Sequence, residues 1–184
     1  SETMQTHLPI GRREAEQRAI AALEEVGIPG AADRIDSYPH EFSGGMRQRV
    51  VIALALCAEP SLVIADEPTT ALDVSVQAQI ITLLRRLCRE RGTAVMLITH
   101  DMGVIAETVD RVAVMYAGRL AELGTVRDVL TRPQHPYTDG LMASTPLAAQ
   151  GQTRLHQIPG AMPRLTQMPD GCAFHPRCPH AQDK

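Results

Sequence analysis

Apolar residues recur at helical spacing between residues 12 and 26, and charged side chains fill the positions between them. This pattern predicts an amphipathic helix, because positions three or four apart gather on one helical face. Gly27 and Pro29 follow directly and indicate where the helix ends. The apolar positions are Ala15, Ala19, Ala22, Leu23 and Val26.

After Ser43, Gly44 and Gly45 come Met46 and the polar residues 47–49, and then a continuous apolar run to Cys57. The Ala, Leu and Val content of this run predicts a buried helix, and Ser43, Gly44 and Gly45 predict a turn before it. The longest stretch without a polar residue, 50–58, is far shorter than the roughly 18 residues that a membrane-spanning helix needs.

Two short apolar segments, residues 62–65 and 93–98, flank a second amphipathic helical pattern. The order strand, helix, strand predicts a parallel α/β sheet with buried strands. Ligands of such sheets bind beyond the carboxyl ends of the strands. We therefore expect Asp66 and Glu67, after the first strand, to share one rim with His100, after the second.

The carboxyl third of the chain has a different pattern. Residues 111–116 and 119–122 predict a hairpin that turns at an Ala-Gly pair, and residues 126–130 predict a short helix. From Pro133 onward the sequence is rich in proline. We expect this tail to be mostly loops.

The composition is that of a folded chain, with 184 residues, 44% hydrophobic, 3% aromatic and a formal net charge of −3. Arginines are scattered and aromatic side chains are few, so nothing predicts a nucleic-acid partner. No basic segment followed by an apolar run opens the chain, and we expect a soluble, cytosolic protein. The four cysteines lie in two unlike settings, which argues against a disulfide framework.

Lysine is nearly missing from the sequence. Of the 18 basic residues 17 are Arg, and the one lysine is Lys184. No internal lysine can therefore hold a phosphate, form a Schiff base or act as a catalytic amine.

Two segments have side chains suited to phosphate chemistry. Ser43, Gly44 and Gly45 precede a helix, whose start attracts anions, although an ordinary serine cap explains the same residues. Asp66 could hold Mg²⁺ through water, and Glu67 could orient or deprotonate a water that attacks a γ-phosphate. Two solvated acids in a turn are the alternative, which the apolar strand before them weakens.

His100 and Asp73 each allow a functional and a structural interpretation. His100 could donate a hydrogen bond to a transferring phosphoryl group, although a lone histidine at a strand end is more often structural. Asp73, seven residues beyond Asp66, could belong to the same site or be only the N-cap of the next helix.

Together these motifs resemble the ATP-binding cassette (ABC) ATPases. Residues 42–46 resemble the ABC signature, residues 62–67 the Walker B strand with its catalytic Glu, residues 71–73 the D-loop, and His100 the switch histidine. Met46 stands where the family usually has Gln. Residues 37–49, 66–74, 135–138, 158–160 and 171–179 are similar to the ATPase subunits of bacterial oligopeptide and dipeptide importers.

The resemblance implies an α/β, P-loop NTPase-like fold in three parts. Residues 1–60 would be part of the helical subdomain with the signature, 61–132 the carboxyl half of a RecA-like core, and 133–184 an oligopeptide-transporter-type extension. ATP and Mg²⁺ would be bound. Glu67 and His100 would be catalytic, Asp66 would hold Mg²⁺ through water, and the nucleotide would contact Ser43, Gly44, Gly45, Met46 and Asp73.

The resemblance also implies partners and a location. The partners would be a second ABC ATPase subunit, transmembrane permease subunits and, indirectly, an extracytoplasmic peptide-binding protein, on the cytoplasmic face of the membrane. The family's phosphate-binding loop needs a lysine upstream of the signature, and this sequence has none there. We therefore expect the carboxyl part of a longer ATPase, which alone neither binds ATP tightly nor hydrolyses it.

The tail contains a group of metal-ligand side chains. Cys172, His175, Cys178 and His180 could offer a Zn²⁺ site. Some members of the peptide-importer subfamily hold an iron–sulfur cluster in this region, which needs four thiolates, whereas this tail has two. Absence of any metal is an equally open interpretation.

Three function classes stay open. The first is an ATPase subunit of a peptide importer, with nickel or another small solute as an alternative cargo. The second is a non-transport ABC ATPase that acts on DNA or ribosomes, although the long coiled coils or basic patches of that class are not seen in the sequence. The third is an interaction module that acts only by dimerising.

Overall fold

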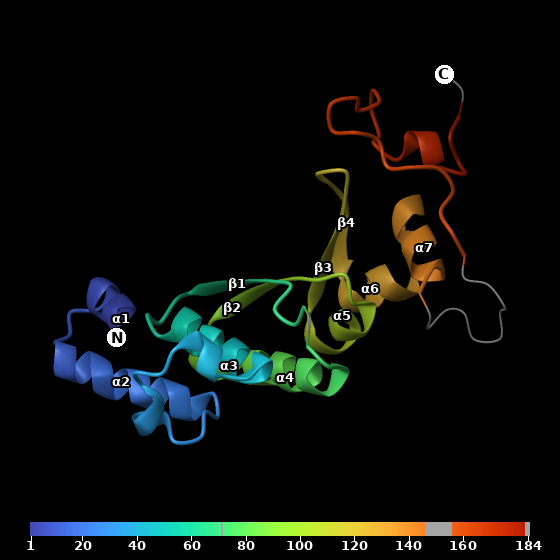
Figure 1. The fold of residues 1–184 in the computed structure, drawn as a ribbon. Coiled ribbons are helices and arrows are strands. Elements are labelled where there is room, and N and C mark those ends of the chain that lie inside the picture. Colours follow the sequence, from blue (N-terminus) through green and yellow to red (C-terminus); the bar gives the residue numbers. More distant parts are fainter. Residues whose placement is uncertain (71, 146–155, 183–184) are drawn as a thin grey trace. The chain divides into compact units, whose positions relative to one another are not determined.

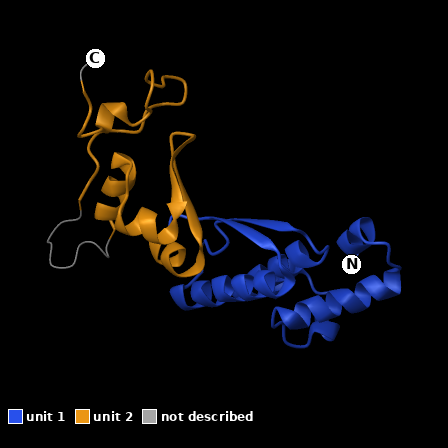
Figure 2. Cartoon of the chain, turned by 180° about the vertical axis from the view of Figure 1, so that it is seen from behind, with its two compact units in different colours: residues 1–100 blue, residues 101–184 orange. Residues whose placement is uncertain are grey.

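The structure, a computed structural model, describes residues 1–70, 72–145 and 156–182. It divides into two compact units, residues 1–100 (unit 1) and residues 101–184 (unit 2), which Figure 2 colours separately. Ala71 of the D-loop-like segment and Lys184 lie outside the described residues. Across those described ranges, no helix combines the length and apolar character that crossing a membrane requires.

Unit 1 is an α/β unit, and the predicted helices and strands are confirmed within it. Gly92, with a φ of 66°, ends the long helix α4, as a glycine in the left-handed region commonly does. The α-helices and strands, labelled in Figure 1, are α1 (Glu2–His7), α2 (Arg12–Glu25), α3 (Gly44–Leu56), β1 (Leu62–Asp66), α4 (Val74–Arg91) and β2 (Ala94–Ile98). Two short 3₁₀ helices, η1 (Ala31–Arg34) and η2 (Pro39–Glu41), lie between α2 and α3.

Strands β1 and β2 pair in parallel, from Leu62 opposite Ala94 to Asp66 opposite Ile98. Alternate side chains of a strand point to opposite faces, and Val63 and Ala65 pack into the aliphatic core with α4. Figure 1 shows α3 and α4 on one side of this strand pair.

The prediction that both strands are buried is wrong for the opposite face. Ile64 on β1 is 59% exposed, and Met96 and Ile98 on β2 are 47% and 43% exposed. Among the described residues of unit 1, helices cover the strand pair on one side only. The apolar sequence therefore predicts the two strands correctly, but it does not show whether other elements cover both faces of the strand pair.

Helix α3 is also less buried than its sequence predicts. Ile52, Ala53 and Leu56 are buried, whereas Val51 and Leu54 are half exposed. The apolar residues surround the helix, but in the described structure only one side of it has a packing partner. Its first residues also differ from the expectation, because Gly44 and Gly45 lie inside the first helical turn rather than in a turn before it.

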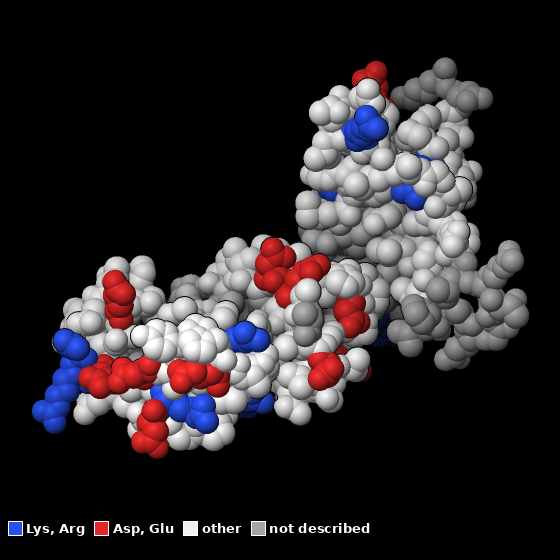
Figure 3. All heavy atoms as spheres, viewed as in Figure 1, with Lys and Arg blue, Asp and Glu red and all other residues white. Residues whose placement is uncertain are grey.

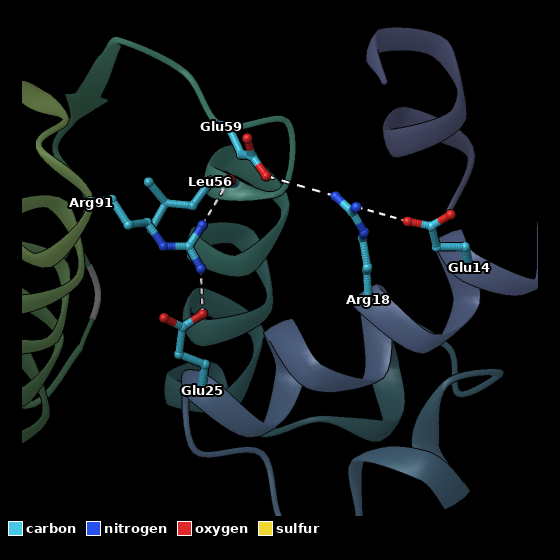
Figure 4. Close-up of polar contacts among 6 residues, drawn as sticks. All are labelled: Glu14, Arg18, Glu25, Leu56, Glu59 and Arg91. Atoms are coloured by element: carbon cyan, nitrogen blue, oxygen red, sulfur yellow. Dashed lines mark hydrogen bonds and ion pairs between the residues drawn. The ribbon is translucent and has the colours of Figure 1, made fainter. Parts of the chain in front are cut away.

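Arginine side chains join the helix ends of unit 1, as Figure 4 shows. Arg91, at the end of α4, donates to the Leu56 carbonyl at the end of α3 (3.1 Å) and to the Glu25 carboxylate at the end of α2. Arg18 lies between the carboxylates of Glu14 (2.7 Å) and Glu59 (3.7 Å). Arg91 is thus a second donor to a helix-terminal carbonyl that also accepts from the Glu59 N–H (3.1 Å).

Unit 2 begins with helix α5 and contains the predicted hairpin. Its strands turn at Ala117 and Gly118, whose φ values of 47° and 75° suit a tight hairpin turn. The pairing shifts register between Val114 and Met115. The elements are α5 (Met102–Thr108), β3 (Arg111–Tyr116), β4 (Arg119–Thr125), α6 (Val126–Thr131), α7 (Pro136–Ala143) and η3 (His175–Arg177).

The tail is only partly as expected. Residues 156–174 and 178–182 contain no helix or strand, which fits a loop-rich segment. Helix α7, however, begins inside the proline-rich region. Pro136 occupies its first position, where a missing N–H costs nothing, and the His135 ring accepts a hydrogen bond from the Tyr137 N–H (3.0 Å).

An aromatic cluster, Tyr116, Tyr137 and Phe174, holds this tail to the hairpin within unit 2. The Phe174 ring meets Tyr116 edge-on at 5.2 Å between centroids and Tyr137 at 5.5 Å. Arg177 donates to the carbonyls of Ile158 (2.9 Å) and Pro159 (2.8 Å) and to the Tyr116 hydroxyl (3.2 Å). The cluster uses three of the chain's five Phe and Tyr residues.

Charged side chains of both signs are interspersed on the face of unit 1 that Figure 3 shows. This distribution agrees with the scattered arginines of the sequence. It presents no continuous basic stripe on that face, so it does not favour a nucleic-acid partner.

Candidate functional site

Glu67 occupies an unusual backbone position directly after β1. Its φ is 43°, in the left-handed region that residues with a Cβ seldom adopt. Its N–H donates to the Ile98 carbonyl (2.9 Å), which continues the strand pairing by one rung, and its carbonyl accepts from the Thr70 N–H (3.1 Å). The backbone on both sides of this glutamate is therefore held by hydrogen bonds, as is common where strain accompanies function.

The carboxylate of Glu67 contacts two side chains. His100, which follows β2, places Nδ1 3.1 Å from Glu67 Oε1, and Thr70 donates its hydroxyl to Oε2 at 2.8 Å. Because an ionised carboxylate can only accept, the His100 ring donates from Nδ1. The structure thus brings together Glu67 and His100 at one rim, as the strand order predicts.

The electrostatics of this pair favour an ionised glutamate. The hydrogen bond from Thr70, followed by that from His100, holds the pKa of Glu67 below its ordinary value. The side chains of Glu67 and His100 are 47% and 84% exposed, so the pair is open to a solvent molecule or a ligand. A charged carboxylate with a neighbouring imidazole can orient a water molecule and accept its proton.

Asp66, the last residue of β1, lies opposite Ile98 at the same rim and is exposed. An exposed carboxylate oxygen at a strand end suits hydrated Mg²⁺, which keeps several of its own waters. Asp66 therefore fits the ligand type that this ion prefers.

Ser43, Gly44 and Gly45 form a second group at the start of α3. Ser43 is the N-cap and accepts from the Met46 N–H at 3.3 Å. A Cβ built on Gly45 would lie 2.9 Å from Val76 Cγ1 of α4, so the glycine allows the two helices to approach closely. The glycines therefore serve packing as well as any approach of an anion.

Asp73 occupies the N-cap position of α4, and its side chain makes no capping hydrogen bond. The position agrees with the structural interpretation, but the hydrogen bond that would stabilise the helix is not formed. Asp73 is exposed, and its carboxylate is accessible to a ligand.

The metal-ligand side chains of the tail do not converge. Cys172 and Cys178 are free thiols, and within the described ranges no group of three or more His, Cys, Asp or Glu is placed to hold a metal ion. The described residues therefore do not fit a Zn²⁺ site or an iron–sulfur cluster.

Burial raises the pKa of the other two thiols, Cys57 and Cys88, which favours the protonated form.

Thr70 is the residue of this site that the sequence interpretation misses. It lies within the segment that resembles the family, but the pattern assigns it no role. A hydroxyl three residues after an acid in a tight turn is the local signal that could have pointed to it.

Two family models match the chain. The model described as ABC transporter matches residues 1–70, and the one described as oligopeptide/dipeptide transporter, C-terminal region, matches residues 121–184. The first match includes both the start of α3 and Glu67.

Curated proteins match almost the whole chain. The oligopeptide transport ATP-binding protein OppD of Escherichia coli (strain K12) is 54% identical over 183 residues, which are 99% of this chain and 54% of OppD. The dipeptide transport ATP-binding protein DppD of Bacillus subtilis (strain 168) is 50% identical, covering 97% of this chain and 53% of DppD. The chain spans about half the length of the curated relatives it matches.

Solved structures share the fold. The cbiO1 protein of Clostridium perfringens, part of the ABC transporter complex cbiONQ, matches with a TM-score of 0.59 and 32% identity, over 67% of this chain and 48% of cbiO1. A bacterial ABC transporter cassette, solved as a dimer, matches with a TM-score of 0.54 and 32% identity, over 64% of this chain and 50% of that cassette. The α/β architecture of unit 1 is thus similar to that of solved ABC transporter cassettes.

Proposed function

Since the chain belongs to the ABC transporter family and carries the oligopeptide/dipeptide transporter C-terminal region, we propose that it forms part of an ATP-hydrolysing subunit of a peptide importer. The single observation that carries the proposal is the Glu67–His100 pair at the end of two parallel strands. The proposal concerns a whole subunit, because the curated relatives are about twice as long as this chain.

Each residue of the rim has a proposed task. Glu67 orients the attacking water and accepts its proton. His100 keeps the carboxylate in place from Nδ1 and donates toward the γ-phosphate from Nε2, two tasks that together require an N–H on both ring nitrogens. Asp66 holds hydrated Mg²⁺ through water. When bound, this ion neutralises charge on the phosphates.

The start of α3 has a different proposed task. Ser43, Gly44, Gly45 and Met46 cap a nucleotide that a second ATPase subunit holds, with Asp73 near the same junction. The support is the similarity to a cassette solved as a dimer and the position of these residues at the start of a 13-residue helix, whose N-cap Ser43 is exposed.

The proposed partners and organisation follow from the family. We propose transmembrane permease subunits, indirect work with an extracytoplasmic peptide-binding protein, and a peripheral place on the cytoplasmic side of the membrane. We propose the division into residues 1–60, 61–132 and 133–184, with the C-terminal-region match at 121–184 in support of the last part. An iron–sulfur cluster in the longer protein would need thiolates beyond Cys172 and Cys178.

The test uses the full-length subunit, reconstituted with its permease subunits in lipid vesicles. MgATP hydrolysis and uptake of a labelled peptide are expected together, and Glu67→Gln is expected to lower turnover at least about 100-fold because the general base is lost. Glu59→Gln is a matched control, because Glu59 also has a positive φ (53°) and is exposed. ATP-driven uptake of nickel but not of peptide, or copurification with nucleic acid, would contradict the proposal.

A further inference from the structure

Thr70 makes two contacts with one residue. Its N–H donates to the Glu67 carbonyl at 3.1 Å, and its hydroxyl donates to Glu67 Oε2 at 2.8 Å. Main chain and side chain of Thr70 are thus both bonded to Glu67 across a single turn. A β-branched side chain has few rotamers, so the direction of this hydroxyl is restricted.

The Glu67 carboxylate needs such a restraint. Its side chain is about half exposed, and a solvated glutamate samples several rotamers. Among the described residues, the other side-chain contact of this carboxylate comes from His100, which is 84% exposed and lies on the segment after β2. The hydrogen bond from His100 therefore depends on the position of a second segment of the chain. Thr70, in contrast, belongs to the same turn as Glu67.

We propose that Thr70 is a positioning residue, which holds Glu67 Oε2 so that Oε1 faces His100 and the attacking water. This inference rests on the proposed function, since it concerns the residue that activates the water. Thr70 does not touch the reacting atoms. It reduces the rotamers of Glu67 before the nucleotide arrives, and misplacement of a reacting group by about 1 Å can cost about 100-fold in rate.

The experiment measures steady-state MgATP hydrolysis by the full-length subunit with its permease. Thr70→Ser keeps the hydroxyl, Thr70→Ala removes it, and Thr70→Val removes it while keeping the shape. We expect kcat to fall about 10-fold in Thr70→Ala and Thr70→Val, with KM within about twofold, and Thr70→Ser to stay within about threefold of the parent. A loss confined to kcat shows that chemistry, and not binding, is impaired.

A double-mutant cycle separates this role from a structural one. On the Glu67→Gln background, Thr70→Ala is expected to lower the residual turnover no further, because the carboxylate it would position is gone. Thr82→Val, on an exposed position of α4, is the control for replacing a threonine in unit 1 and should leave kcat unchanged. Thermal melting of each variant reports folding, and the Ser and Ala pair still decides the question if Thr70→Val does not fold.

The outcomes distinguish the two proposals. If the parent hydrolyses ATP and Glu67→Gln does not, but Thr70→Ala retains full kcat or Thr70→Ser loses as much as Thr70→Ala, only the role of Thr70 is overturned. A rise in KM without a change in kcat also overturns it. If the parent does not hydrolyse ATP, or Glu67→Gln hydrolyses it normally, the proposed function of Glu67 fails and the role of Thr70 fails with it.

Discussion

In unit 1 the buried side chains are mostly aliphatic and come mainly from packed helices, whereas in unit 2 three aromatic rings and one arginine hold an irregular tail to a hairpin. Leu56, Ile80 and Leu87 are the largest aliphatic side chains that are fully buried in the core of unit 1. In unit 2, Phe174 comes from the irregular tail and is 2% exposed.

The difference shows how two kinds of sequence reach a folded state. Helices bond their own backbone, so their stability depends mainly on burying an apolar face. An irregular tail leaves carbonyl groups that need hydrogen-bond donors from other residues. Arg177 is the donor for two of these carbonyls, those of Ile158 and Pro159. Planar rings and a planar guanidinium group provide contact area without periodic spacing.

The largest expected effect comes from removing the central ring of unit 2. Phe174→Ala is expected to lower the free energy of unfolding of unit 2 by about 3 kcal/mol, because a buried ring is replaced by a cavity. Hydrogen exchange resolved by peptide should show faster exchange in β3 and β4 and unchanged exchange in α4.

Leu165→Ala is the control in the same unit, since Leu165 is 72% exposed. This variant should change the free energy by less than about 0.5 kcal/mol. Equal protection of β3 and β4 in Phe174→Ala and the parent would contradict the importance of the aromatic cluster.

A smaller loss in the free energy of unfolding is expected when one arginine in each unit is replaced by lysine. Arg177→Lys keeps the charge but loses the fork that donates to three acceptors, and should cost unit 2 about 2 kcal/mol. Arg91→Lys, which affects one carbonyl and one carboxylate, should cost unit 1 about 1 kcal/mol. Urea unfolding followed by hydrogen exchange measures both, and a larger loss in Arg91→Lys would reverse the comparison.

The smallest expected effect is a pH dependence confined to unit 2. Glu122 accepts from the N–H groups of Gln134 (2.9 Å) and His135 (3.0 Å). Burial acts to raise the pKa of Glu122, but the neighbouring Thr138 hydroxyl, these two N–H groups and the nearby His135 together outweigh it and lower the pKa.

Because the pKa is lower in the folded chain, this stabilisation is present above the ordinary value of about 4.5 and is lost as the pH falls through the folded value. Glu122→Gln should therefore weaken the pH dependence of hydrogen-exchange protection in β4 between about pH 5 and 3. Exchange in α4 serves as the internal control. An unchanged pH profile in the variant would show that other carboxylates cause it.

Much of the fold was accessible from the sequence because local patterns encode local structure. The spacing of apolar residues predicted α2 and α4, and the Ala-Gly pair predicted the β3–β4 turn. The order of strand and helix also predicted that Glu67 and His100 share a rim. Helix α7 was missed, because a proline that begins a helix looks the same in the sequence as one that ends it.

The sequence by itself thus determined most of the longer elements, their order and the chemical type of the rim residues, since these depend on neighbours along the chain. Only the tertiary structure decided which faces are covered, as the exposure of Ile64 and Met96 shows. It also decided that Thr70 bonds Glu67 and that Gly45 lies against Val76. The first contact depends on a turn with a positive φ and the second on the distance between two helices, and the spacing of apolar residues encodes neither.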